Sequence, residues 1–413
     1  MKADRIFYSD TLSGRTVSYG QLIEELNRGA TFTPYCKSAD YYHVFKQLVL
    51  SLLSGNEITL LDSDFTALEV ATLVGEEAEI GNQKYVLPET EITADNLFER
   101  LTLHTDSWRV TLFTSGTTGL PKKVSHSFPS VARQVRKSAS HSDDVWGFAY
   151  NPTHMAGLQV FFQALLNGNS MVRLFGLDAK DIVREINGKR ISHISATPTF
   201  YRMLLPPSGV CPSVVRLTSG GEKFDGHTLR ELASLFPNAR ITNVYASTEA
   251  GSLFASRGNS FVVGENLKGR VRITDGELLL HKSLLAESSS VCLDGEWFHT
   301  GDLVAVSCES PLTFTFISRK TEMINVGGYK VNPVEVEERL RECPGVRDAF
   351  VYAKANRITG HIIMADVVRD NPGTEERDLR ERLRLKLQEF KIPRIIRFVT
   401  CLNTTRTGKI SRQ

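Results

Sequence analysis

A run of small and hydroxylated residues, TSGTTGLPKK at Thr114–Lys123, follows a segment with the pattern of a β-strand. Backbone N–H groups in such a turn can point together at one anion, and Lys122 adds a full positive charge. The run has neither the G-x-x-x-x-G-K-S/T nor the G-x-G-x-x-G spacing, which excludes the two commonest nucleotide-binding loops here. It therefore predicts a phosphate-binding turn of another kind, with a flexible surface turn as the alternative.

This run closely resembles the phosphate loop of the adenylate-forming superfamily, which comprises acyl-CoA synthetases, peptide-synthetase adenylation domains and luciferases. Within that superfamily, the chain is most similar in character to aryl- or o-succinylbenzoate-type acyl-CoA ligases. Further segments resemble family motifs and occur in the family's order: NPTHMAG at Asn151, SGGEKF at Ser219, YASTEAG at Tyr245, WFHTGDL at Trp297, SRKTEMINVGGYKVNPVEVE at Ser318 and TTRTGKISR at Thr404.

The resemblance implies a reaction that joins a carboxylate to the α-phosphate of ATP. Because that step brings negative groups together, it needs cations and oriented hydrogen-bond donors. The resemblance implies that Glu249 holds Mg²⁺ and that Thr248 bonds the phosphate or acyl oxygens, whereas an isolated Thr-Glu pair is otherwise typical of a helix cap. Lys409 resembles the lysine that bridges the carboxylate and the α-phosphate in the transition state, although a lysine so near the chain end is otherwise a solvated tail residue.

The resemblance also implies a nucleotide site. Asp302 resembles the carboxylate that accepts hydrogen bonds from both ribose hydroxyls, and Arg319 resembles the arginine that contacts the ribose and phosphates. Tyr245 offers a ring on which adenine can stack. The glycines of these motifs would by themselves indicate turns. The implied ATP-binding residues are Thr114, Ser115, Gly116, Thr117, Thr118, Lys122, Gly220, Gly221, Glu222, Tyr245, Asp302 and Arg319.

A second half-reaction with coenzyme A is implied by the segment after Arg319. In this family a small C-terminal domain swings between an adenylation pose and a thiol-transfer pose, and Thr321 stands at the usual pivot, where Asp or Lys is common. Gly327 and Gly328 resemble the pair beside the pantetheine arm, and Lys330 resembles a lysine tied to thiol transfer. A turn leading into a helix is the alternative for these three residues.

The acid is expected to be small or medium, either aromatic or short-acyl. His154 matches the position beside the acyl pocket, where it can keep water from the acyl phosphate, with a core or helix-capping histidine as the alternative. Peptide-synthetase domains place an aspartate just after this position to pair with an α-ammonium, and this chain has none there, so an amino acid is disfavoured. The implied substrate-pocket residues are His154, Met155, Gly157, Ser219 and Ala246.

The elements that must position these residues alternate between strand and helix. Strand patterns and helix patterns follow one another at βα spacing after Trp108, which predicts an α/β fold with a mainly parallel sheet covered by helices. From about 254 to 318 short β-like runs replace the helices and indicate a β subdomain. We therefore expect a large N-terminal domain over 1–319, trimmed at its N-terminus relative to the family, and an α+β lid domain over 320–413.

The composition agrees with a folded, water-soluble protein of about two or three domains, since 41% of its 413 residues are hydrophobic and 23% are charged. A net charge of +2 argues against a nucleic-acid partner. Its six cysteines lack metal or redox spacing, and the first residues lack a secretion signal, so we expect a cytoplasmic protein without a membrane span.

The most specific function that the sequence predicts is an AMP-forming acid–CoA ligase with ATP, Mg²⁺ and coenzyme A as cofactors. One alternative keeps the adenylation but loads the phosphopantetheine arm of an acyl carrier protein, which presents the same thiol. A second alternative is a non-catalytic nucleotide-binding scaffold.

Overall fold

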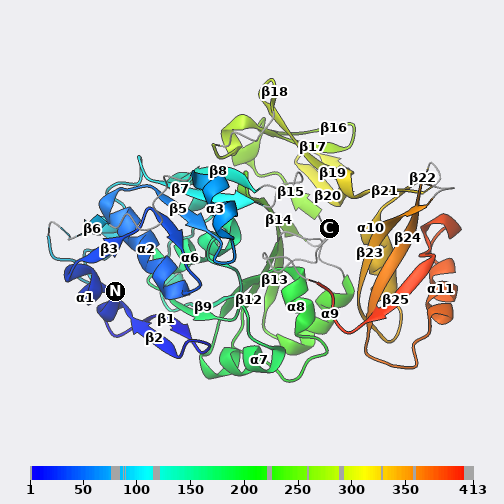
Figure 1. Cartoon of the computed structure of the whole chain (residues 1–413), viewed down its shortest axis with the longest axis horizontal. Coiled ribbons are helices and arrows are strands. Elements are labelled where there is room, and N and C mark those ends of the chain that lie inside the picture. The colour runs from blue at the N-terminus through cyan, green and yellow to red at the C-terminus, as the bar shows by residue number, and fades with distance from the viewer. Residues whose placement is uncertain are drawn as a thin grey trace.

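A computed structural model of the chain (Figure 1) describes residues 2–75, 84–86, 88, 90–114, 121–220, 226–257, 260–287, 293–326, 329–356 and 360–403.

The largest sheet among these residues has 14 strands, and the part that contains β1 and β9–β13 is mainly parallel. Strands β13, β12, β11, β9, β10 and β1 lie side by side in parallel pairs, with β2 and β14 antiparallel at either side. The predicted α/β fold is confirmed. The strands of this part are β1 (Ile6–Asp10), β2 (Arg15–Ser18), β9 (Val145–Phe148), β10 (Ser170–Arg173), β11 (His193–Ala196), β12 (Arg216–Gly220), β13 (Arg240–Ser247) and β14 (Gly251–Arg257).

The rest of this sheet is antiparallel and corresponds to the expected β subdomain. Because β14 pairs with β13 on one side and with β15 on the other, the two parts form one continuous sheet. The sequence alone indicated an attached subdomain, and its boundaries remain a prediction. The strands are β15 (Ser260–Val262), β16 (Val271–Thr274), β17 (Glu277–His281), β18 (Leu293–Asp294), β19 (Trp297–Glu309) and β20 (Leu312–Arg319).

A separate four-stranded sheet carries the predicted phosphate turn. Strands β4, β5 and β7 are parallel, and β8 returns antiparallel to β7. A short antiparallel pair, β3 with β6, lies apart from both sheets in the pairing order. The strands are β3 (Ala30–Phe32), β4 (Tyr35–Lys37), β5 (Ile58–Leu61), β6 (Lys84–Val86), β7 (Arg109–Thr114) and β8 (Lys122–Ser127).

Helices α2 and α6 form the centre of the main hydrophobic core. Helix α2 begins because the Asp40 carboxylate accepts the first backbone N–H groups, and it ends where Gly55 adopts φ +66°. Its Phe45 stacks on Phe161 of α6 with ring centroids 5.0 Å apart. The helices before residue 320 are α1 (Tyr19–Asn27), α2 (Tyr41–Ser54), α3 (Ala67–Val74), α4 (Leu97–Leu101), α5 (Phe128–Val131), α6 (Met155–Leu165), α7 (Ala179–Gly188), α8 (Pro198–Met203) and α9 (Gly226–Leu235).

The C-terminal part has a hydrophobic cluster of its own, in which apolar residues of α10 and α11 cover strands β23 and β24 (Figure 1). The last α-helix among the described residues, Glu376–Arg384, is followed by turns and a short 3₁₀ segment. The elements are β21 (Ile324–Val326), β22 (Tyr329–Val331), α10 (Pro333–Arg341), β23 (Val346–Asn356), β24 (Gly360–Arg369), α11 (Glu376–Arg384) and β25 (Ile395–Val399).

Within the described parts of the chain, no helix combines the length and the apolar character that crossing a bilayer requires.

Candidate active site

The predicted motif residues lie just beyond the carboxyl ends of neighbouring strands. Asn151 and His154 follow β9, Ser219 and Gly220 end β12, and Thr248 follows β13. These three strands run parallel and are linked through β11, so their carboxyl ends share one edge of the sheet. In open α/β sheets ligands bind in the crevice outside this edge.

The predicted phosphate turn joins β7 to β8. Thr114 ends β7 and pairs in register with Lys122, the first residue of β8, so the two strands form a hairpin. Lys122 is half-buried. The hairpin fixes both ends of the predicted loop, whose residues Ser115, Gly116, Thr117 and Thr118 lie outside the described residues.

His126 connects this hairpin to the segment after β13. Its ring is fully buried, with Nε2 2.7 Å from the carbonyl oxygen of Thr248 and Nδ1 2.9 Å from Oγ of Ser130. Burial lowers the pKa of His126 to about 4, outweighing the opposing effect of the Thr248 carbonyl. The ring is therefore neutral: Nε2–H donates to Thr248, and Nδ1 accepts from the Ser130 hydroxyl.

The turn that carries Thr248 and Glu249 is also held by its backbone. Arg133 Nη1 donates to the carbonyl oxygen of Ala250 over 3.0 Å, and the N–H of Ala286 donates to the carbonyl oxygen of Glu249 over 2.7 Å. The side chains of Thr248 and Glu249 are both half-buried. The backbone of this turn is thus fixed while its side chains remain partly accessible.

Tyr245, Asp302 and Arg319 form a hydrogen-bonded cluster. The Tyr245 hydroxyl donates to Oδ2 of Asp302 over 2.5 Å, and Nε of Arg319 donates to Oδ1 over 3.0 Å. Asp302 is buried, whereas 53% of the Arg319 side chain is exposed. Burial and then the Asp302 charge raise the pKa of Tyr245, so its hydroxyl stays protonated and can donate.

Strand pairing and a buried glutamate orient Asp302. Asp302 of β19 lies opposite Arg319 of β20 in the sheet register. Just before it, Gly301 adopts φ +73° and donates its N–H to Oε1 of Glu277 over 2.9 Å. Burial opposes the ionisation of Glu277, but the hydrogen bonds from His299 and Gly301 outweigh it and lower the pKa of this carboxyl. Glu277 therefore anchors the turn that presents Asp302.

His154 faces Asp62, a residue that directly follows β5. The His154 Nε2 atom lies 3.4 Å from Oδ2 of Asp62, and Asp62 is 5% exposed. The Thr153 hydroxyl and the Asn151 amide both donate to Oδ1 of the same carboxylate. The His154 side chain makes no cap hydrogen bond at the start of α6, so the structure does not support the helix-capping alternative.

Two glycines of the motifs allow close backbone packing. A Cβ at Gly157 would lie 2.3 Å from the carbonyl oxygen of Asn151, and a Cβ at Gly220 would lie 2.9 Å from Cγ2 of Val244. Both positions therefore exclude a side chain for structural reasons. Met155 is buried in the core beside Gly157.

Ser219 and Ala246 also lie at this edge. Ser219 is fully buried, and its Oγ has no hydrogen-bond partner among the described residues. Ala246 is half-buried at a register shift between β13 and β14.

The predicted coenzyme A residues lie on the C-terminal side of β20. Thr321 is exposed in a 3₁₀ segment, Lys320–Glu322, and Lys330 is exposed on β22. Outside the described residues lie Gly221, Glu222, Gly327, Gly328 and Lys409.

Sequence reasoning missed the residues that support the motifs: Asp62, His126, Arg133 and Glu277. One signal for Asp62 was available, because the segment EITLLD places a carboxylate directly after a buried parallel strand. His126 stands only three residues after the phosphate-turn run, but its partner Thr248 is 122 residues away.

Known proteins resemble this chain over most of its length. A family model described as AMP-binding enzyme matches residues 56–275, and one described as AMP-binding enzyme C-terminal domain matches residues 335–409. The 2-succinylbenzoate–CoA ligase of Bacillus licheniformis is 26% identical over 75% of this chain and 70% of its own length. The human mitochondrial acyl-coenzyme A synthetase ACSM5 is also 26% identical, and the chain spans 73% of itself and 59% of that protein.

A solved structure shows the same fold. The o-succinylbenzoate coenzyme A synthetase (MenE) of Bacillus subtilis, in complex with ATP and magnesium ion, superposes with a TM-score of 0.71 at 18% identity, covering 98% of this chain and 95% of its own. The names of the relatives agree with the predicted class of AMP-forming acid–thiol ligase. Because the first family model alone spans more than half of the sequence, the prediction of an adenylate-forming protein is confirmed, and the chain belongs to the AMP-binding enzyme family.

Proposed function

We propose that this protein joins a carboxylic acid to AMP at the expense of ATP and then transfers the acyl group to the thiol of coenzyme A. The observation that carries the proposal is the buried Asp302 carboxylate, held between Tyr245 and Arg319 beside the edge where the other family motifs meet. The names of the two relatives, a CoA ligase and an acyl-coenzyme A synthetase, support the same reaction.

Asp302 suits the ribose of ATP. A carboxylate oxygen has two lone pairs, and the hydrogen bonds from Tyr245 and Arg319 use one on each oxygen. One acceptor site on each oxygen is left for a ribose hydroxyl. The ring of Tyr245 and the backbone of Gly220, Gly221 and Glu222 are proposed to hold the adenine.

Glu249 and Thr248 are proposed to face the phosphates. Carboxylate oxygens are hard ligands that suit Mg²⁺, which neutralises phosphate charge when it is bound with ATP. The backbone around Glu249 is anchored at Ala250 and at its own carbonyl, so the carboxylate is presented from a fixed turn. The solved structure that holds ATP and magnesium ion supports this cofactor pair.

In the first half-reaction, an oxygen of the acid attacks the α-phosphorus of ATP, and the bond to the β-phosphate oxygen breaks to release pyrophosphate. Lys409 is proposed to stabilise the charge shared by the carboxylate and the α-phosphate, and residues 114–118 with Lys122 are proposed to hold the leaving phosphates. In the second half-reaction the thiolate of coenzyme A attacks the acyl carbon, and AMP leaves. Thr321, Gly327, Gly328 and Lys330 are proposed to serve this step.

The acid is proposed to be small or medium, aromatic or short-acyl, and to lie near His154, Met155, Gly157, Ser219 and Ala246. The nearby Asp62 is already engaged by Thr153, Asn151 and His154. No aspartate stands directly after His154, where peptide-synthetase domains place one. This favours acids without an ammonium group, since an unpaired buried charge is costly.

The alternative acceptor of the acyl group is the phosphopantetheine thiol of an acyl carrier protein. The relatives' names favour free coenzyme A.

The proposed compartment is the cytoplasm. Five cysteines are free thiols, as is usual in that reducing compartment: Cys36, Cys211, Cys308, Cys343 and Cys401.

The proposal is tested by a screen of carboxylic acids for ATP-dependent pyrophosphate release, run with and without coenzyme A, with the thioester identified by mass. We expect release with at least one small acid and a thioester when coenzyme A is present. Lys409→Ala should lower adenylation by about 10²-fold or more while ATP still binds, because it removes charge stabilisation needed in the transition state. Pyrophosphate release by that variant at the wild-type rate would contradict the mechanism.

A further inference from the structure

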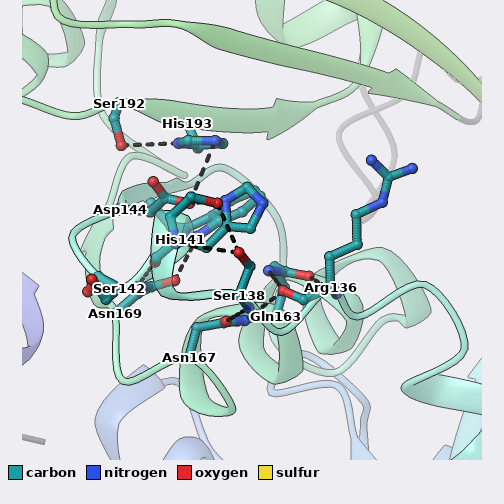
Figure 2. A network of polar contacts seen from close by, with 12 residues as sticks. Arg136, Ser138, His141, Ser142, Asp144, Gln163, Asn167, Asn169, Ser192 and His193 are labelled. Atoms are coloured by element: carbon teal, nitrogen blue, oxygen red, sulfur yellow. Dashed lines mark hydrogen bonds and ion pairs between the residues drawn. The ribbon is translucent and has the colours of Figure 1, made fainter.

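Two histidines and an aspartate meet at a place that the proposed reaction does not use. Nδ1 of His141 lies 2.9 Å from Oδ2 of Asp144, and Nε2 of His193 lies 3.6 Å from the same oxygen. One ligand atom from each residue can be chosen so that all three lie within 4.8 Å of one another. Figure 2 shows Asp144 between the two imidazole rings.

These separations fit a tetrahedral metal ion. Metal–ligand bonds of about 2.0–2.1 Å at tetrahedral angles place ligand atoms about 3.3 Å apart. The distances from Asp144 Oδ2, 2.9 Å to His141 and 3.6 Å to His193, lie on either side of that value. The third pair of ligand atoms, one from each imidazole, lies within 4.8 Å, so side-chain shifts bring all three atoms to this spacing. Two imidazoles with one carboxylate form a donor set that zinc commonly takes, with water as fourth ligand.

The hydrogen bonds around His193 orient its ring toward the carboxylate. The Ser192 hydroxyl accepts the N–H of Val145 over 2.9 Å and lies 2.9 Å from Nδ1 of His193. Because Nδ1 is held on that side, the other ring nitrogen, Nε2, faces Asp144. A second contact that fixes the ring of a histidine in this way is typical of histidines that bind a metal ion.

Side chains from elsewhere in the fold anchor the segment that carries His141 and Asp144 by hydrogen bonds to its backbone carbonyl groups (Figure 2). The side-chain amide of Asn169, which is fully buried, donates to the carbonyl oxygens of His141 and Ser142 over 2.6 and 3.2 Å. Further along the same segment, Gln163 and Asn167 donate to the carbonyl oxygen of Arg136. The ligand positions are therefore fixed before any ion arrives, which reduces the entropy lost on binding.

The cluster lies at the edge of the sheet opposite the proposed active site. Asp144 directly precedes β9, and His193 is the first residue of β11, so both stand at the amino ends of parallel strands. The motifs of the proposed active site follow the carboxyl ends of parallel strands in this sheet. A strand of four residues separates the two ends by roughly 13 Å. The exposed fractions are 28% for His141, 12% for Asp144 and 8% for His193, so the cluster is sheltered yet open to solvent on one side.

We propose that His141, Asp144 and His193 bind a zinc ion or a similar borderline divalent cation, with water completing the coordination. The ion joins the segment before β9 to the start of β11 and stabilises this edge of the sheet. The site does not depend on the proposed ligase activity, because its residues are separate from the active-site motifs.

The test measures zinc binding by chelator-treated full-length protein, with Zn²⁺ alone as the probe and a chromogenic chelator as competitor. We expect one tight zinc per chain and a rise in Tm on zinc addition. Asp144→Asn and His193→Gln should each weaken zinc binding by about 10-fold or more, and zinc should no longer raise the Tm of either variant. The matched control is His104→Gln, which removes an exposed histidine outside the cluster and should leave zinc binding unchanged.

Two results overturn the proposal. One is wild-type zinc affinity in Asp144→Asn, which would show that the three residues are only a hydrogen-bonded network. The other is the absence of an anomalous peak between the three side chains in zinc-soaked wild-type crystals measured at the zinc edge. The crystal measurement decides the question even where a variant fails to fold.

Discussion

At the scale of single residues, the proposed nucleotide site is built around the buried carboxylate of Asp302. A buried carboxylate is tolerated only when its oxygens are hydrogen-bonded, and here Tyr245 and Arg319 each bond one oxygen. The same two donors fix the direction of the lone pairs that remain.

We predict that Asp302→Asn raises the KM for ATP about 10-fold or more in pyrophosphate exchange. The amide replaces an acceptor oxygen with a donor, which breaks a charge-assisted hydrogen bond of about 1.5–3 kcal/mol. Asp275→Asn is the control, because Asp275 is an exposed turn residue with φ +50°, a conformation that asparagine also adopts readily. An unchanged KM for ATP in Asp302→Asn would remove Asp302 from the nucleotide site.

His126 predicts a pH dependence of stability. Its pKa is about 4 in the folded protein against 6.5 for an ordinary histidine, so between these values the unfolded chain binds a proton that the folded protein does not. The free energy of unfolding of the wild type therefore falls as the pH falls through this window. His126→Gln should be less stable than wild type near pH 7.5, and its deficit should shrink toward pH 4.5.

Urea unfolding at the two pH values measures this difference. His104→Gln, at an exposed position, reports the general effect of losing a histidine. A deficit of His126→Gln that does not change with pH would show that the buried ring is not the source.

At the scale of elements, strand register places the residues of the proposed nucleotide site. Asp302 of β19 and Arg319 of β20 lie opposite one another in the sheet and are 17 positions apart in the sequence. A slip of one residue would turn one of these side chains to the other face of the sheet. The hydrophobic pattern of the two strands therefore fixes the chemistry as well as the core.

The start of α6 depends on a glycine. We predict that Gly157→Ala lowers the free energy of unfolding by about 1–3 kcal/mol, since its Cβ would lie 2.3 Å from the backbone oxygen of Asn151. Gly188→Ala at the end of α7 is the matched control, because its Cβ meets nothing within 4 Å, and it should be neutral or stabilising by about 0.4–1 kcal/mol. Equal unfolding midpoints for Gly157→Ala and wild type would show that the contact is relieved without cost.

At the scale of the whole molecule, Asp348 joins the C-terminal part to the large sheet. Its carboxylate lies 3.2 Å from Nε of Arg202 on α8 and 3.3 Å from Nη1 of Arg341 on α10. Both arginine side chains are 7% exposed. Removing one charge from such a buried group is more costly than breaking a surface pair.

We predict that Asp348→Asn loosens this junction and speeds tryptic cleavage at Arg319 and Lys320 several-fold, because their exposed segment joins the two parts. Asp370→Asn is the control, since Asp370 is 46% exposed and pairs with Arg347 at 3.8 Å on the surface. Equal cleavage rates for the two variants would mean that Asp348 does not hold the parts together.

Local patterns in the sequence were enough to indicate the α/β class, the alternation of strands and helices after Trp108, and the family motifs. Those features depend on short-range rules: the period of apolar residues, the caps of helices and the residue types in turns. Thus the strand directly before the run of small and hydroxylated residues was indicated by adjacent residues, and it is β7 (Arg109–Thr114).

Only the tertiary structure decided which residues support the motifs. His126 and Thr248 are 122 positions apart, Thr153 and Asp62 are 91 apart, and Tyr245 and Asp302 are 57 apart. The proposed zinc site of His141, Asp144 and His193 likewise forms because β9 and β11 are neighbours in the sheet. Residue types state which bonds a side chain can make, but the strand order decides which distant partner lies within reach.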